Sequence, residues 1–205
     1  KAFRNGHASF EVGDRIVTLV SLTLTPLHLE AILGVKGEQL TVRGHAILFE
    51  SGVAHRLPPD LPEATALAVF DVCGAPALAA HLMHPGDQVV ILGAGKAGLL
   101  VAAEARKRVG KLGKVFLFDA DPAAVAAAEK LPFVDQARTV NGQNPPEVME
   151  LVAKLTEARM ADLVVNCANV AGTEMATILA AKRTGTALFF NMATSFQAAV
   201  LGAEG

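Results

Sequence analysis

A regular alternation of apolar strands and helices over residues 88–192 constrains the fold of this 205-residue chain more than any other feature. Short apolar runs predict parallel-type strands at 88–92, 114–118, 137–140, 161–166 and 187–192. Helical patterns lie between them, at 96–109, 122–130, 145–159 and 172–184. Almost continuous apolar strands are typical of parallel strands that helices cover on both faces. The sequence therefore predicts an α/β fold built on a doubly wound parallel sheet.

A glycine-rich turn joins the first of these strands to the first helix. It reads Gly93-Ala94-Gly95-Lys96-Ala97-Gly98, the GxGxxG spacing of a Rossmann dinucleotide-binding turn. Gly93 allows the tight turn, Gly95 lets the backbone approach a pyrophosphate, and Gly98 lets the helix pack closely. All six residues of the turn are predicted to contact a cofactor.

Asp119 ends the second predicted strand, about 20 residues after Gly98, where an acid binds the ribose hydroxyls of the adenosine. An acid there disfavours the 2′-phosphate of NADP, so we expect NAD as the cofactor. A simpler alternative is that Asp119 only caps the next helix. A methyltransferase also uses a glycine-rich turn and an acid after its second strand, but the glycine spacing favours a dinucleotide.

Ligands of open α/β sheets bind beyond the carboxyl ends of the strands. This rule adds further predicted cofactor contacts at Ala120, Asn166, Cys167, Ala168 and Met192. For Cys167, the simpler interpretation is a small apolar side chain that fills space beside the site.

Composition excludes several function classes. Hydrophobic residues make up 52% of the chain and charged residues 19%, so the chain can bury a large core. A net charge of −2 without a basic run argues against nucleic acid and anionic membranes as partners. The two cysteines form no zinc or disulfide framework, and the six histidines lack metal-ligand spacing, so we expect no metal and a cytoplasmic location.

The segment before the sheet has a different residue pattern. Short β-rich runs predict strands at 15–21, 39–43 and 45–49, and an Ala- and Leu-rich stretch predicts helix over 62–83, broken near Pro76. We therefore expect a partial β-rich domain at 1–61, a linking helical segment at 62–84 and a dinucleotide-binding domain at 85–205. Because a sixth strand is missing, we expect a piece of a longer protein.

This order of parts, with the junction sequence RLPPDLPEATALAVFDVCGAPALAAHLMHPGDQVVILGAGKAGLL, resembles the medium-chain dehydrogenase/reductase superfamily. The strings TLVSLTLTPL, ILFESG, DVCGAPA and NMATSF are more specific and resemble the family of L-erythro-3,5-diaminohexanoate dehydrogenases. The resemblance implies a GroES-like β-rich domain before the Rossmann sheet. Val72 stands where zinc-dependent superfamily members carry a catalytic cysteine, which points to the zinc-free class.

The family resemblance implies NAD-dependent oxidative deamination of L-erythro-3,5-diaminohexanoate to 5-amino-3-oxohexanoate and ammonia, in lysine fermentation. The partners it implies are this diamino acid and a second copy of the chain, as a homo-oligomeric dimer. Catalytic candidates are Glu50, in ILFESG, and Asp71, a carboxylate inside an otherwise apolar helix. A zinc-free quinone or enoyl reductase and a non-catalytic NAD-sensing module remain as alternatives.

Overall fold

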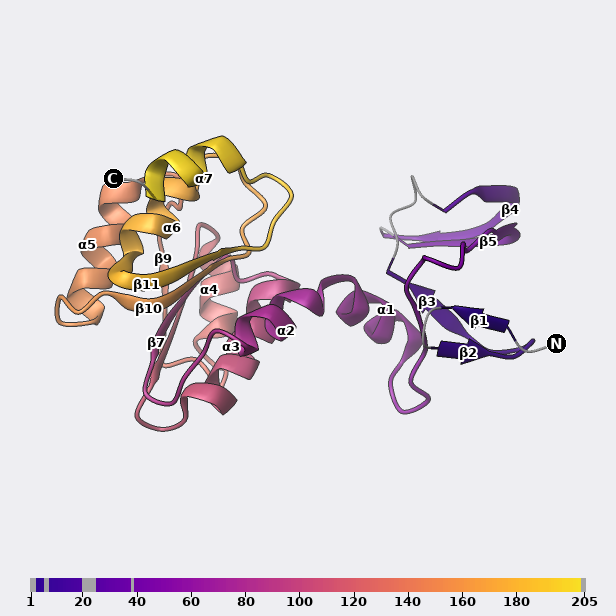
Figure 1. The fold of residues 1–205 in the computed structure, drawn as a ribbon, viewed down its shortest axis with the longest axis horizontal. Helices are drawn as coiled ribbons and strands as arrows, with labels where there is room; N and C mark the ends of the chain where they lie inside the picture. The colour runs from indigo at the N-terminus through magenta and orange to yellow at the C-terminus, as the bar shows by residue number, and fades with distance from the viewer. Residues whose placement is uncertain (1–2, 6–7, 20–24, 38, 204–205) are drawn as a thin grey trace. The chain divides into compact units, whose positions relative to one another are not determined.

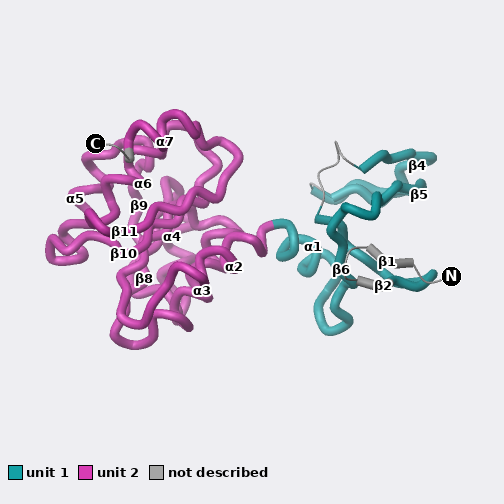
Figure 2. Tube along the Cα trace, viewed as in Figure 1, with its two compact units in different colours: residues 1–71 teal, residues 72–205 magenta. Residues whose placement is uncertain are grey.

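The computed structural model describes residues 3–5, 8–19, 25–37 and 39–203. The chain divides into two compact units, residues 1–71 and residues 72–205 (Figure 2). The division falls between Asp71 and Val72, within the segment expected to link the two domains.

A five-stranded parallel sheet forms the centre of the unit of residues 72–205 (Figure 1). Its strands are β7 (Gln88–Leu92), β8 (Lys114–Asp119), β9 (Gln136–Thr139), β10 (Ala161–Asn166) and β11 (Ala181–Phe189). The spatial order is β11-β10-β7-β8-β9. From β7 the chain winds outward through β8 and β9, then returns to the other side of β7 for β10 and β11. This order confirms the predicted doubly wound sheet.

Helices cover both faces of the sheet, and the period of two along each strand decides which residues meet which helices. Val89 and Ile91 pack in one core cluster with α2 (Gly74–Ala80), α3 (Lys96–Val109) and α4 (Pro122–Ala128). Val90 and Leu92 pack in the other with α5 (Pro145–Leu155) and α6 (Glu174–Ala180). Each fully buried side chain of this kind contributes about 1.5–3 kcal/mol to stability.

Some predicted ends of helices and strands are wrong, because tertiary contacts override the preference of the local sequence. The helix expected at 172–184 ends at Ala180, and β11 begins at Ala181, six residues earlier than predicted. Gly185 lies so close to β10 that a Cβ there would stand 2.7 Å from the carbonyl oxygen of Ala161. The helix expected to continue to 159 ends at Leu155, and α7 (Phe196–Ala203) was not predicted at all.

The described residues of the unit 1–71 form three two-stranded antiparallel sheets. Their strand pairs are β1 (Phe3–Asn5) with β2 (Ala8–Phe10), β3 (Ile16–Thr18) with β6 (Ala54–Arg56), and β4 (Leu27–Lys36) with β5 (Gln39–Ala46). The strand predicted at 15–21 corresponds to β3, and its positions 20 and 21 lie outside the described residues.

One expectation for this unit is wrong, and one long strand was not expected. The strands predicted at 39–43 and 45–49 are one strand, β5, which passes through Gly44 without a break. A Cβ at Gly44 would lie 2.2 Å from the carbonyl oxygen of His28, so glycine here permits close strand pairing rather than a turn. The long strand β4 was not predicted.

The helical segment after β6 is a pair of helices, α1 (Glu63–Val72) and α2. The break lies at Cys73 rather than at Pro76. Pro76 lies in the first turn of α2, where its missing N–H removes no helical hydrogen bond. In the described part of the chain, no single helix is long and apolar enough to cross a membrane, and α1 and α2 meet that test only together, as a bent pair.

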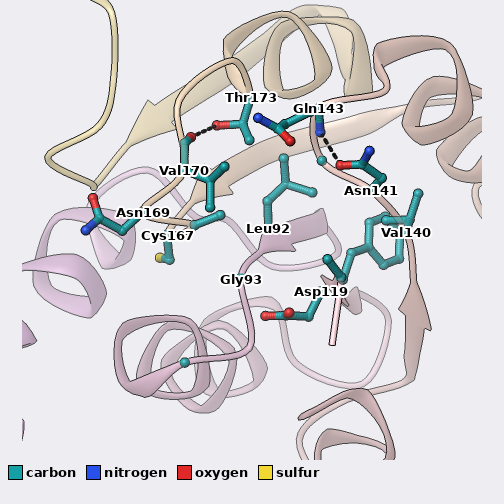
Figure 3. Close-up of a pocket in the computed structure, with 15 residues that line it drawn as sticks. Leu92, Gly93, Asp119, Val140, Asn141, Gln143, Cys167, Asn169, Val170 and Thr173 are labelled. Carbon is teal, nitrogen blue, oxygen red and sulfur yellow. Dashed lines mark hydrogen bonds between the residues drawn. The ribbon is translucent and has the colours of Figure 1, made fainter. Parts of the chain in front are cut away.

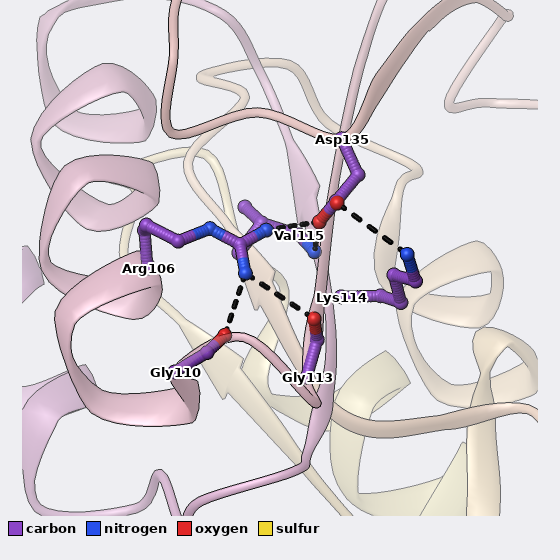
Figure 4. A network of polar contacts seen from close by, with 6 residues as sticks. All are labelled: Arg106, Gly110, Gly113, Lys114, Val115 and Asp135. Carbon is purple, nitrogen blue, oxygen red and sulfur yellow. Dashed lines mark hydrogen bonds and ion pairs between the residues drawn. The ribbon is translucent and has the colours of Figure 1, made fainter.

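A polar network ties the carboxyl end of α3 to the beginning of β8 (Figure 4). The Arg106 guanidinium donates to the carbonyl oxygens of Gly110 at 2.7 Å and Gly113 at 3.2 Å, and forms an ion pair with Asp135. The Asp135 carboxylate also accepts the N–H of Val115 at 2.7 Å. One side chain thus satisfies two turn carbonyls and a carboxylate at the edge of the sheet opposite its carboxyl ends.

Replacing Arg106 by methionine keeps the aliphatic stem and removes the two hydrogen bonds and the ion pair that the guanidinium makes. Because Arg106 and Asp135 are only 25% and 24% exposed, we expect a loss of about 2–3 kcal/mol in the free energy of unfolding, measured by urea denaturation. Arg108→Met is the control, since the Arg108 side chain is 52% exposed and pairs with Glu104 one turn away. That change should cost no more than about 0.5 kcal/mol. Equal losses in the two variants would contradict the assignment.

Candidate cofactor-binding cleft

A cleft of about 470 Å³ lies at the carboxyl end of the sheet (Figure 3). Four loops line it, those that follow β7, β8, β9 and β10. The lining residues are Leu92, Gly93, Gly95, Phe118, Asp119, Ala120, Val140, Asn141, Gly142, Gln143, Cys167, Ala168, Asn169, Val170 and Thr173. This is the place where the strand order reverses, between β7 and β10, and it is where open α/β sheets bind ligands.

Two glycines shape the turn between β7 and α3. Gly93 has a φ of +100°, a conformation that only glycine adopts readily, and its N–H donates to the Phe118 carbonyl at 2.7 Å. A Cβ at Gly93 would lie 2.8 Å from the backbone nitrogen of Ala168. At Gly98 a Cβ would lie 1.8 Å from the carbonyl oxygen of Gly93. Glycine at position 98 therefore lets α3 lie close to the turn, and glycine at position 93 lets the turn lie close to the loop after β10.

Gly95 differs from these two because its surroundings are open. It precedes α3 as the N-cap residue and, lacking a side chain, gives the first turn of the helix no side-chain cap. A Cβ at Gly95 would meet no atom within 4 Å, and Gly95 lines the cleft. Open space beside the backbone at the positive end of a 14-residue helix fits a pyrophosphate.

The Asp119 carboxylate lies beside this turn. Its two oxygens accept the backbone N–H groups of Ala94 at 2.6 Å and Asp121 at 2.9 Å. A carboxylate has about four acceptor positions, so about two remain for the hydroxyls of a ribose. The cap of α4 is Asp121, whose side chain accepts the N–H of Ala123 at 2.9 Å. Asp119 is therefore not the helix cap that the simpler alternative required.

Cys167 and Ala168 line the cleft after β10. Burial raises the pKa of the Cys167 thiol to about 12, so the side chain stays a neutral thiol near pH 7. A neutral, largely buried thiol is consistent with a small apolar side chain that fills space beside the site. Asn166, predicted to contact the cofactor, lies fully buried beneath the cleft and does not line it.

The loop after β9 forms a wall that the sequence analysis missed. Asn141, Gly142 and Gln143 line the cleft, and the Gln143 side chain donates to the Ala171 carbonyl at 2.8 Å. The Asn141 side chain accepts the N–H of Gln143 at 3.0 Å (Figure 3). Sequence reasoning could have found this wall, since the Asn-Gly pair directly follows the third predicted strand.

The other predicted site residues lie elsewhere. Ala94, Lys96 and Ala97 belong to the turn but do not line the cleft, and Met192 is 96% exposed after β11. Glu50 is exposed in a turn closed by the hydrogen bond from Gly52 to Phe49. Asp71 is exposed near the end of α1. Both acids belong to the unit of residues 1–71, and their catalytic roles stay predictions. Within the described ranges, no three His, Cys, Asp or Glu side chains come together as metal ligands.

Glu174 is a buried acid next to the cleft that no sequence pattern singled out. Glu174 is only 3% exposed. Its carboxylate accepts the N–H of Ser195 at 2.6 Å, and this hydrogen bond joins the loop after β11 to the start of α6. This hydrogen bond lowers the pKa of Glu174 below its usual value, although burial acts in the opposite direction.

A depressed pKa in the folded state means that the Glu174 carboxylate stabilises the fold above pH 4.5, and that this stabilisation is lost as the pH falls through the folded-state pKa. We expect Glu174→Gln to lower the free energy of unfolding by about 1–2 kcal/mol at pH 7. The difference from the wild type should shrink with acidification below pH 4.5, measured by urea denaturation over a pH series. The exposed Glu150 provides the control, Glu150→Gln, which should change little at any pH. A difference that is constant with pH would refute this role of the carboxylate.

The fold and the cleft together define the class of protein. An alcohol dehydrogenase from Thermus sp. ATN1 has the same fold, with a TM-score of 0.56 and 23% identity, over 70% of this chain and 41% of that one. The chain therefore has the medium-chain dehydrogenase/reductase fold, with a Rossmann sheet.

More specific similarity comes from sequence. Residues 2–58 match the family model of the L-erythro-3,5-diaminohexanoate dehydrogenase N-terminal domain. The L-erythro-3,5-diaminohexanoate dehydrogenases of Acetoanaerobium sticklandii and Fusobacterium nucleatum are each 45% identical over 98% of this chain. The chain spans 59% of the length of each. It is thus homologous to these dehydrogenases over almost its whole length, which confirms the resemblance found in its sequence.

Proposed function

We propose that this protein is a dehydrogenase that oxidatively deaminates L-erythro-3,5-diaminohexanoate with NAD. The observation that carries the proposal is the 45% identity to two proteins named for this activity, over 98% of the chain. The cleft supports it independently, because Gly95 leaves space for a pyrophosphate and Asp119 offers acceptors to a ribose. The reductase and the sensing module would also hold a dinucleotide in this cleft, so the sequence identity is what favours the dehydrogenase over them.

The proposed reaction has two steps, oxidation of the amine to an iminium and hydrolysis of that iminium. The C–H bond at carbon 3 breaks and its hydride leaves, while the ammonium nitrogen on that carbon gives up one proton. Water then adds to the resulting iminium, and ammonium departs to leave 5-amino-3-oxohexanoate. Bound NAD would supply the hydride acceptor. This chain would hold the pyrophosphate at the start of α3 and a ribose at Asp119, while a carboxylate such as Glu50 or Asp71 would take the proton and bind an ammonium group.

The preference for NAD over NADP also belongs to this proposal. A 2′-phosphate would have to lie beside the Asp119 carboxylate, where like charges repel. The next residue, Ala120, lines the cleft and offers no positive charge to offset that repulsion. NAD lacks this phosphate and would give hydroxyls to the same oxygens.

Three broader features complete the proposal; the cytoplasmic location rests on the sparse cysteines, and the other two rest on the family resemblance. We place the protein in the cytoplasm, in lysine degradation, and in a homo-oligomer, with a dimer as the expected state. A small diamino acid is its proposed partner, rather than nucleic acid or a membrane surface.

The test is NADH formation at 340 nm by the full-length protein with racemic 3,5-diaminohexanoate, using NAD or NADP, with and without a chelator. We expect turnover with NAD that survives chelation, a much lower rate with NADP, and one ammonium released per NADH formed. Saturable NADH binding without turnover of this substrate would contradict the proposed substrate and favour the reductase or the sensing module.

A further inference from the structure

Asn166 is the last residue of β10, fully buried beneath the cofactor-binding cleft, and all of its side-chain hydrogen bonds go to the chain segment that follows it. Its amide nitrogen donates to the hydroxyls of Thr173 and Thr177, both at 2.8 Å. Its amide oxygen accepts the N–H of Ala168 at 3.1 Å. One side chain thus binds the loop of residues 167–173 at both of its ends.

The hydroxyls fix the direction of these bonds. The Thr173 hydroxyl donates to the Val170 carbonyl at 3.1 Å (Figure 3), and the Thr177 hydroxyl donates to the Thr173 carbonyl at 2.8 Å. Since both hydroxyl protons are already used, each oxygen can only accept from residue 166. The site therefore requires two donors and one acceptor on a single planar group, which an asparagine side chain supplies and an aspartate does not.

The loop of residues 167–173 is one wall of the cleft. Cys167, Ala168, Asn169, Val170 and Thr173 line it. The Ala171 carbonyl accepts the hydrogen bond from Gln143 that joins this wall to the opposite one. A shift of the loop would therefore change the shape of the cleft on two sides.

We propose that Asn166 is a positioning residue for the dinucleotide, which holds the loop of residues 167–173 in the shape that binds it. This inference rests on the proposed function, because it needs a nicotinamide dinucleotide in the cleft. It assigns to Asn166 a role different from the direct cofactor contact predicted from sequence. The affinity for the dinucleotide should depend on buried groups that never touch it.

Two substitutions test this role in the full-length protein, with NADH as the probe and its fluorescence as the readout. Asn166→Asp keeps the shape and the acceptor for Ala168 but faces two hydroxyl oxygens with no proton to give them. The loss of these two hydrogen bonds should raise the NADH dissociation constant at least about tenfold. Thr177→Val removes one acceptor from Asn166 outside the cleft lining and should raise the constant by a smaller factor.

Thr156→Val is the matched control. Thr156 is equally buried, and its hydroxyl donates to the Val152 carbonyl at 2.7 Å and accepts the N–H of Met160 at 3.0 Å, just before β10 begins. It should lower the melting temperature as Thr177→Val does and leave the NADH dissociation constant unchanged.

Weaker NADH binding in Asn166→Asp and Thr177→Val, with wild-type affinity in Thr156→Val, would support the positioning role. Wild-type affinity in both test variants would overturn it, as would an equal loss in Thr156→Val, which would make the effect one of stability. If Asn166→Asp does not fold, Thr177→Val against Thr156→Val decides. A wild-type protein that binds no NADH would overturn the proposed function itself, and this inference with it.

Discussion

Replacing Gly95 by alanine is expected to abolish measurable NADH binding while leaving the fold almost intact. The added Cβ meets no protein atom within 4 Å, so it projects into the space that a pyrophosphate needs beside the first turn of α3. We expect the NADH dissociation constant to rise at least about a hundredfold, which corresponds to about 2.7 kcal/mol. The free energy of unfolding should fall by no more than about 1 kcal/mol, the cost of alanine at an N-cap.

The measurement is a fluorescence titration with NADH, paired with urea denaturation of the same preparation. An alanine variant that binds NADH as the wild type does would show that the dinucleotide does not approach the backbone at Gly95. A variant that unfolds would show that the space around Gly95 is not open.

Gly98→Ala is expected to give the opposite result, three residues further along the same motif. A Cβ at Gly98 would lie 1.8 Å from the carbonyl oxygen of Gly93 and 3.4 Å from the Ile91 side chain. Since the first of these atoms is backbone, α3 would have to move away from β7. We expect a loss of at least about 3 kcal/mol in the free energy of unfolding, measured by urea denaturation, the upper range for overpacking.

The expected destabilisation is opposite in sign to the usual effect of replacing glycine by alanine in a helix. Elsewhere in a helix, glycine to alanine usually stabilises a protein by about 0.5–1 kcal/mol. A Gly98→Ala variant as stable as the wild type, or more stable, would contradict the close packing of α3 on β7.

The sheet was predictable because its three central strands, β7, β8 and β10, are buried on both faces. All five residues of β7 are buried, and such strands appear in the sequence as uninterrupted apolar runs bounded by glycine and proline. The strand β4 was missed for the opposite reason, since almost every residue along it is exposed and no burial pattern marks it. The end of α5 was missed because the left-handed backbone at Glu157 and Ala158, with φ of +53° and +64°, carries no residue signal such as glycine.

The candidate site was predictable as far as backbone rules reach. The GxGxxG spacing located the turn between β7 and α3, because a close strand-to-helix turn requires glycine at fixed positions. The acid after the second predicted strand located Asp119 beside that turn. The roles of polar side chains under and beside the cleft were not predictable. Asn166, Gln143 and Glu174 each act through a partner up to 28 residues away, and only the folded chain brings those partners together.

The most direct test of the central claim is a titration of the purified full-length protein with NADH, followed by competition with ADP-ribose. If the cleft holds a nicotinamide dinucleotide at Gly95 and Asp119, NADH will bind saturably, one per chain, and ADP-ribose will displace it because it presents the same pyrophosphate and adenosine. NADPH will bind more weakly. Absence of saturable NADH binding, or NADH that ADP-ribose does not displace, would contradict the account.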